Sequence, residues 1–326
     1  MARSTAARSV PAARRFAIES LENRELMAGD ITFNVIGGNL FINGDNAANG
    51  LQIGQVAPNQ FALIGTEQGG GNTSVQGARF QIASGVTGSV FINMNGGNDA
   101  IKIEDGPVPL ISPVAQAGVP RSFQFPVFAQ NMVVNMGAGA DNFVSEGMEL
   151  IGRLAIDTGF GNEVDTIKME RLEVNANNTG GLALDIDTQG GNDKVEVIDG
   201  VMRGLVDIDT GSEDDIVNIE DILIGRNSEV RIRTQAGNDN VTVRESYFTD
   251  LDIDTGAGQD FVNLDDIFLE ALLSVNLGAD SDILQTERLR ANSVELDGSF
   301  GTDALIDQGD NAVQSLIIRN FEIVVD

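Results

Sequence analysis

The residues of this chain best suited to chemistry are aspartates that end a short, repeated, glycine-rich segment. The segment reads apolar-x-apolar-(Asp/Asn)-(Thr/Met/Leu)-Gly-x-Gly-x-Asp-x-apolar-x-apolar and occurs about nine times. Its clearest copies begin at Leu184, Val206, Val230 and Leu251. Carboxylates in such turns have two chemical uses. They accept hydrogen bonds from backbone N–H groups, or they bind a hard, oxygen-ligated cation such as Ca²⁺.

These turn aspartates recur at intervals of 21 to 24 residues from Asp193 to Asp303. Upstream the intervals are less regular, and a proline-rich stretch, 105–128, lies between two of the turns. Weaker copies of the segment surround Asp99, Asp141, Asp165, Asp282 and Asp303. The aspartates that we select as candidate calcium ligands are Asp99, Asp141, Asp193, Asp215, Asp239, Asp260, Asp282 and Asp303.

The segments that flank each turn have the two-residue hydrophobic period of β-strands. Leu251 and Ile253 precede one turn, and Val262 and Leu264 follow it. Frequent glycine and aspartate, together with abundant Val and Ile, argue against helices. Similar turns at similar intervals favour stacked coils over an antiparallel sandwich. We therefore predict an all-β, right-handed parallel β-solenoid (β-helix) with about 22 residues per coil.

Stacking would turn each repeated polar residue into a column with a spacing of about 4.8 Å. The turn aspartate shares its parity with the apolar residues that follow, as in Asp260, Val262 and Leu264, and is expected to point inward. Aspartates before the turn have the opposite parity and should lie on an outer face. They are Asp185, Asp187, Asp207, Asp209, Asp252 and Asp254. Because Arg231 and Arg233 belong to a coil between these acids, we also predict cross-strand ion pairs.

Composition excludes several classes of site and partner. The chain has no Cys and no His, which removes disulfides, thiolate zinc sites and the commonest general base. Asp and Glu number 49 against 20 Lys and Arg, a net charge of −29, so a nucleic-acid partner is disfavoured. No apolar run has the roughly 18 to 20 residues that a membrane-spanning helix needs, so the chain is not expected to span a membrane.

The glycine-rich turn resembles the RTX calcium-binding repeat, Gly-Gly-x-Gly-x-Asp-x-U-x, in which U is a large apolar residue. The resemblance implies that Asp side chains and Gly carbonyls of stacked turns hold Ca²⁺. The matching residues are Gly97 with Asp99, Gly137 and Gly139 with Asp141, Gly191 with Asp193, Gly237 with Asp239, Gly256 and Gly258 with Asp260, and Gly301 with Asp303. Glu213 and Asp280 replace the second glycine in two turns. RTX repeats have binding turns on both sides of the coil, whereas here one turn per coil qualifies. The alternative therefore stays open that each Asp, without a metal, caps the backbone N–H groups of its own turn.

The stretch from Ile18 to Asp30 resembles the LEPR-XLL segment at the amino termini of large planctomycete-type surface proteins. Leu21, Glu22, Arg24 and Leu26 match it, while Asn23 replaces the family's Pro and Met27 its last Leu. The resemblance implies export or sorting to the cell surface. Without it, residues 14–28 would be interpreted as a short amphipathic helix.

Three regions follow from these patterns. Residues 1–30 form a basic, LEPR-XLL-like sorting segment, expected to be largely disordered or a short helix. Residues 31–98 alternate in hydrophobicity without the 22-residue register and are expected to be strands that cap or begin the solenoid. Residues 99–326 form the solenoid repeats, with the proline-rich stretch 105–128 as an inserted loop.

The function expected from this sequence is that of a secreted or cell-surface bacterial protein with a structural or adhesive role, stabilised by calcium at the stacked turns. Its expected partners are other surface or matrix components, including polysaccharide, and further copies of itself in end-to-end association. The alternative is a polysaccharide lyase or hydrolase that uses Asp207, Asp209, Arg231, Arg233, Asp252 and Asp254. We do not favour an enzyme, because Trp is absent and Tyr247 is the single tyrosine, whereas sugar sites normally offer aromatic platforms.

Overall fold

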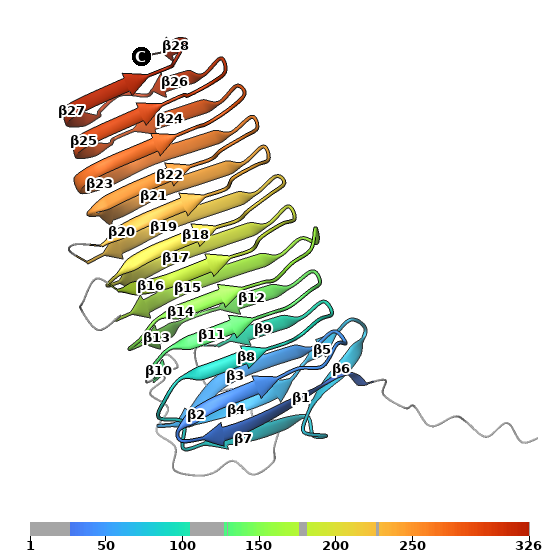
Figure 1. Ribbon diagram of the computed structural model, residues 1–326. Coiled ribbons are helices and arrows are strands. Elements are labelled where there is room, and N and C mark those ends of the chain that lie inside the picture. Colours follow the sequence, from blue (N-terminus) through green and yellow to red (C-terminus); the bar gives the residue numbers. More distant parts are fainter. Residues whose placement is uncertain (1–26, 105–126, 129, 176–180, 226–227, 326) are drawn as a thin grey trace, which may run out of the picture.

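The chain is a parallel all-β solenoid of about 8 turns with about 22 residues per turn, as predicted (Figure 1). The computed structural model describes residues 27–104, 127–128, 130–175, 181–225 and 228–325. The LEPR-XLL-like segment up to residue 26 and most of the proline-rich stretch, 105–126, lie outside the described residues. The described residues contain no helix with the length and hydrophobicity needed to cross a membrane.

Each coil contributes one strand before the glycine-rich turn and one after it, and equivalent strands of successive coils pair in parallel. The strands that precede the turns are β2 (Asn39–Asn43), β8 (Val90–Asn93), β11 (Met132–Asn135), β14 (Leu154–Asp157), β16 (Leu182–Asp187), β18 (Leu205–Asp209), β20 (Glu229–Arg233) and β22 (Asp250–Asp254). Their column continues through the later parts of β23 (Phe261–Asn276), β25 (Arg290–Asp297) and β27 (Ala312–Arg319). We call its solvent-facing side the outer face.

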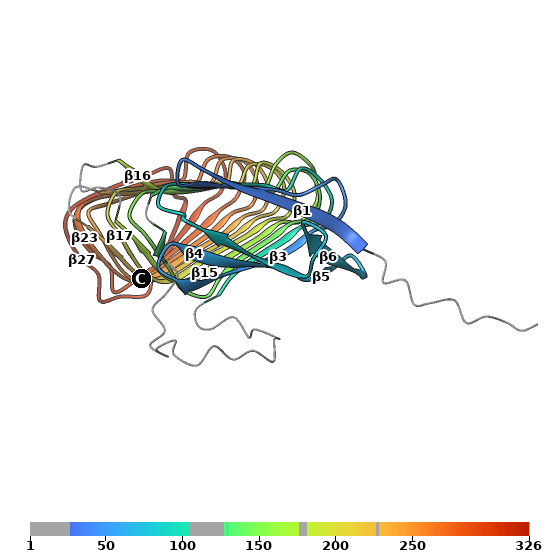
Figure 2. The same ribbon diagram turned by 90° about the horizontal axis from the view of Figure 1, so that it is seen from below.

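The strands that follow the turns form a second parallel column. They are β3 (Gly50–Ala57), β9 (Ala100–Ile103), β12 (Asn142–Ser145), β15 (Thr166–Val174), β17 (Lys194–Met202), β19 (Ile216–Ile224), β21 (Asn240–Phe248), the first part of β23, β24 (Ile283–Glu287), β26 (Ala304–Asp307) and β28 (Ile323–Val325). Two short strands, β10 (Val127–Phe128) and β13 (Met148–Leu150), pair below the end of β15. Figure 2 shows the flattened cross-section that these stacked strands enclose.

A second corner, which the sequence pattern did not reveal, bends the strands that follow the turn. At this corner one non-glycine residue per coil, exposed in every case but Arg288, has a positive φ, for example 53° at Asp221 and 54° at Asp266. The left-handed conformation redirects the chain without interrupting the stacking on either side. The residues at this corner are Arg171, Asp199, Asp221, Glu245, Asp266, Arg288 and Asp310.

The core consists of aliphatic columns that run along the solenoid. Val241, Val262 and Leu284 are stacked in register and fully buried, as are Ile232 and Ile253 in the facing column. Fully burying such a side chain stabilises the fold by roughly 1.5–3 kcal/mol. Because the same column recurs in every coil, each coil covers its neighbour's apolar edge and depends on it.

The amino-terminal strands leave the coil path and cover that end of the solenoid. They are β1 (Met27–Ile36), β4 (Gln60–Gly65), β5 (Glu67–Gln68), β6 (Gly71–Val75) and β7 (Phe80–Ser84). β1 pairs antiparallel with β2, and β4 pairs antiparallel with β3 and with β7. Between them, β2, β3, β8 and β9 already follow the coil path, so the stacked register begins within 31–98.

Candidate functional site

The glycine-rich turns stack on one another as closely as the strands do. Ala236, Ala257 and Ala279, which occupy the same position in three turns, form successive parallel bridges. Gly258 has a φ of +138°, and a Cβ there would lie 1.5 Å from the carbonyl oxygen of Gly237. A side chain at this position would therefore push neighbouring coils apart, which explains the recurrent glycine.

Every predicted turn aspartate is buried at this corner, with at most 2% of its surface exposed. Asp165, which is not among the predicted ligands, is buried with them at 3%. We call these nine residues the Asp ladder: Asp99, Asp141, Asp165, Asp193, Asp215, Asp239, Asp260, Asp282 and Asp303. The predicted inward orientation is correct, and the structure brings all eight selected residues into one column.

Hydrogen bonds link the Asp ladder from coil to coil. The backbone N–H of Asp215 donates to Oδ1 of Asp239 at 2.8 Å, and that of Asp239 donates to Oδ1 of Asp260 at 2.9 Å. The same bond recurs at every step from Asp99 to Asp303, with N···O distances of 2.7–3.0 Å. In this bond each carboxyl caps an amide of the preceding coil, whereas our capping alternative had it serve its own turn.

Both ends of the Asp ladder have terminating residues that the sequence pattern did not reveal. At the amino-terminal end, the buried Asn49 donates its backbone N–H to Oδ1 of Asp99 at 2.6 Å. At the other end, Oε2 of Glu322 accepts the backbone N–H of Asp303 at 2.9 Å. Asn49 and Glu322 stand where the repeat would place another aspartate, but neither belongs to a copy of the glycine-rich motif.

The second carboxyl oxygen of the ladder residues is buried and has no partner in hydrogen-bond geometry in eight of the nine. These Oδ2 atoms belong to Asp99, Asp141, Asp193, Asp215, Asp239, Asp260, Asp282 and Asp303. Against the larger effect of burial, buried threonine hydroxyls beside four of these carboxyls nevertheless lower the carboxyl pKa. A buried carboxylate oxygen without a partner is costly when charged. The site therefore favours a proton on the carboxyl or a cation beside it.

The pKa values of the Asp ladder reflect this burial. Loss of hydration raises the pKa of Asp141 and of Asp215 to about 8. It raises the pKa of Asp99 and of Asp282 to about 7. The accepted backbone N–H opposes the rise in each case, but only in part.

The charged groups that act on the ladder carboxyls are other carboxylates. Neighbouring ladder residues raise the pKa of Asp215, and Glu163 contributes to the rise at Asp141. Asp280 does the same for Asp282. Among the described residues, however, no three acidic side chains converge on one point as metal ligands. A cation here would need backbone carbonyls and water to complete its shell of six to eight oxygens.

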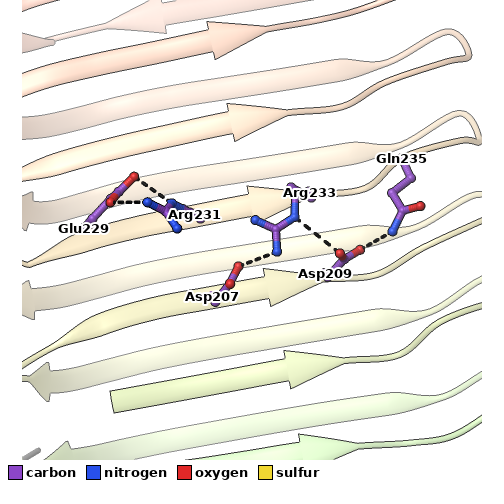
Figure 3. Close-up of polar contacts among 6 residues, drawn as sticks. All are labelled: Asp207, Asp209, Glu229, Arg231, Arg233 and Gln235. Carbon is purple, nitrogen blue, oxygen red and sulfur yellow. Dashed lines mark hydrogen bonds and ion pairs between the residues drawn. The ribbon is translucent and has the colours of Figure 1, made fainter. Parts of the chain in front are cut away.

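The outer face carries the second set of aspartates, and these are partly exposed to solvent. We call Asp185, Asp187, Asp207, Asp209, Asp252 and Asp254 the outer acids; all are intermediate or exposed. Arg233 lies 2.8 Å from Oδ1 of Asp207 and 3.3 Å from Oδ2 of Asp209, on the neighbouring strand (Figure 3). These contacts confirm the predicted cross-strand ion pair for Arg233.

Arg231 behaves differently from Arg233. It forms two hydrogen bonds of 2.8 Å with Glu229, two residues away on its own strand, as Figure 3 shows. The cross-strand pair that we predicted for Arg231 is therefore replaced by a pair along the strand. Asp252 and Asp254 lie in register with Arg231 and Arg233.

Two hollows in the described part of the chain are lined by residues other than the outer acids. An open depression of about 650 Å³ lies at the carboxyl-terminal end, lined by Ile306, Asp307, Gln308, Gly309 and Val325. Inside the core, an apolar void of about 10 Å³ lies among stacked Val, Ile, Met and Phe side chains. Neither adjoins the outer acids.

Comparison of the chain with protein-family models, with curated proteins and with solved structures finds no match. The molecule is thus characterised by its own architecture, a β-solenoid with a buried Asp ladder.

Proposed function

We propose that this chain is a structural or adhesive protein of the bacterial cell surface or the extracellular space. The observation that carries the proposal is the uniform stack, in which the Asp ladder links every described coil to the next. Such a stack gives a stiff, extended body whose strongly acidic surface is solvated. Its partners would be other surface or matrix components, including polysaccharide.

Calcium is part of this proposal. Eight buried Oδ2 atoms without a partner line one corner, and a divalent cation beside them would offset their charge. Protonation offsets the same charge without a metal. The two states differ in their response to calcium, because only the calcium-bound state gains stability with the logarithm of the ion concentration.

The experiment is thermal unfolding followed by circular dichroism, in millimolar calcium and then in chelator. We expect a midpoint that is higher with calcium and rises further with its concentration. Asp260→Asn should reduce this response, whereas the matched outer variant Asp252→Asn should preserve it. A midpoint unchanged by calcium would remove the metal from the proposal.

The location and role can be tested separately in the source cells. Intact cells treated with a non-permeant protease should lose the protein, and a deletion strain should lose adhesion or surface integrity. Full protection of the protein in intact cells would contradict a surface or extracellular role.

A polysaccharide-active enzyme remains the second candidate because of one observation on the outer face. Burial, with Asp157 and Asp209 nearby, raises the pKa of Asp187 to about 6, as a general acid requires. Against this candidate, the ring of Tyr247 stacks on Phe268 with centroids 5.0 Å apart and planes at 4°. These two ring faces are turned toward each other and offer no sugar platform between them. Turnover of acidic or neutral polysaccharides that is abolished by Asp209→Ala or Asp254→Ala would establish the enzyme instead.

A further inference from the structure

The carboxyl-terminal end of the described solenoid presents an apolar strand edge. In the described part of the chain, β27 pairs only with β25, and β28 pairs only with β26. Leu316 and Ile318 stack on the buried Val294 and Leu296, yet they are 53% and 40% exposed. Their positions face the core in every earlier coil, so a further layer is needed to cover them.

The side chain at the neighbouring outer position also departs from the repeat. Ile317 occupies the position of Asp252, Ser274 and Glu295 in the three preceding coils, and it is 36% exposed. Natural edge strands usually carry charges that prevent pairing with another chain. β27 has apolar side chains on both of its faces at this point instead.

We propose that this end docks on the same end of a second copy, with β27 pairing antiparallel to its counterpart around a two-fold axis at Ile317. The inference goes beyond the proposed surface role and does not depend on it.

The backbone geometry of β27 supports this register. The carbonyl of Arg319 accepts the N–H of Gly298, so it points back toward β25. Because backbone groups alternate along a strand, those of Ile317 also point back, and those of Leu316 and Ile318 point to the open edge. Pairing centred on Ile317 joins each Leu316 to the other copy's Ile318 through two hydrogen bonds. Ile317 then faces its own counterpart in the closer, non-hydrogen-bonded position.

Other registers fit less well. Centring the pair on Leu316 would place Ile318 opposite Gln314, and centring it on Ile318 would place Ile317 opposite Arg319. Only the register centred on Ile317 joins apolar residues at all three central positions. A two-fold contact of this kind is self-complementary and stops at a dimer.

The two ends of the molecule do not match each other, which favours tail-to-tail over head-to-tail association. At the amino-terminal end, β1, β4 and β7 run antiparallel to their neighbours and leave the coil path (Figure 1). The last coil of another copy therefore finds no equivalent coil edge there. Head-to-tail filaments are not expected.

The absence of cysteine from the chain permits a specific test of the register. In the proposed dimer the two Ile317 Cα atoms lie about 4.5 Å apart, within the range that a disulfide spans. Ile317→Cys should cross-link to a covalent dimer when copper-catalysed oxygen accepts the two thiol electrons. Ser274→Cys, at the same outer position two coils away, should not.

Sedimentation of the full chain supplies the second readout. We expect a dimer at micromolar concentration, and a monomer for the double variant L316K/I318K with unchanged circular dichroism. The matched double variant F80K/I82K, at exposed positions of the opposite end, should remain a dimer. A monomeric wild-type chain, higher oligomers or filaments, or equal cross-linking at both cysteine positions would overturn the proposal.

Discussion

The Asp ladder and the outer acids show how one residue type serves two purposes at the same spacing. Asp239 and Asp252 lie in adjacent coils, yet Asp239 is 2% exposed and bonded to a backbone amide, whereas Asp252 faces solvent. The buried carboxyls bind coils together, and burial raises the pKa of every one of them. Partial burial also raises the pKa of three outer acids, Asp185, Asp187 and Asp254. The outer ones act through charge, which water and salt screen. The Asp ladder and the outer acids should therefore differ in how much they contribute to the free energy of unfolding. They should also differ in how that contribution changes with pH and with salt.

The largest expected effect of the Asp ladder is on how the stability of the protein depends on pH. Burial raises the pKa of six ladder carboxyls from 3.8 to about 6 to 8, and it raises the pKa of the other three as well. Between these limits the folded state binds more protons than the unfolded state, so the free energy of unfolding falls as pH rises. Each pKa unit by which a folded carboxyl exceeds its unfolded value changes the free energy of unfolding by about 1.4 kcal/mol over this pH range. Several ladder carboxyls contribute to the total. Without calcium, we expect the thermal midpoint to fall by about 10 °C or more between pH 5 and pH 8.5.

Asp215→Asn is the control for this pH prediction. It keeps the amide acceptor at Oδ1 and removes the titrating proton, so the fall in midpoint should become smaller. Asp252→Asn, on the outer face, should leave the fall unchanged. A midpoint that rises with pH in chelator would show that the ladder carboxyls are ionised in the folded state.

Truncation of a ladder residue is expected to have the next largest effect. Asp239→Ala leaves the buried N–H of Asp215 without its acceptor. A buried donor without a partner costs about 1–3 kcal/mol. Asp252→Ala removes a solvated carboxylate and should change the free energy of unfolding by less than about 0.5 kcal/mol. Urea denaturation measures both values.

Asp239→Asn separates the lost hydrogen bond from the lost charge. The amide oxygen can still accept the N–H of Asp215, so this variant should be at least as stable as wild type at pH 8. If Asp239→Asn and Asp239→Ala were equally destabilised, the hydrogen bond would not be the cause of the loss.

The sequence was sufficient to predict the repeat and the direction in which each aspartate points. The two-residue period places Asp260 on the side of Val262 and Asp254 on the other side, and the structure confirms both. The period cannot reveal which amide a carboxyl accepts, because the ladder bond joins residues 21 to 42 positions apart. Asp165 is not among the selected residues, although its turn is a weaker copy of the motif like those of Asp99 and Asp141; its stacking position fixes its burial.

The ladder ends and the second corner were missed for a related reason. Asn49 and Glu322 act through their three-dimensional position, and neither lies in a recognisable copy of the repeat. At the second corner, Asp221 and Asp266 adopt a positive φ without glycine. Asp tolerates this conformation better than most residues, but it is too common in this chain to mark a corner.

The smallest expected effect comes from the ion pairs of the outer face. Arg233→Ala removes contacts of 2.8 and 3.3 Å to Asp207 and Asp209, and its side chain is 38% exposed. Partly exposed pairs of this kind contribute about 0.2–1 kcal/mol, so the loss should be of that size and should vanish in molar salt. Arg231→Ala, whose partner Glu229 is on its own strand, should cost less because no contact between coils is lost. Urea midpoints at low and high salt measure both variants. If Arg233→Ala lost as much stability in high salt as in low salt, the ion pair of Arg233 would be shielded from solvent like the Asp ladder, because only shielded interactions escape screening by salt.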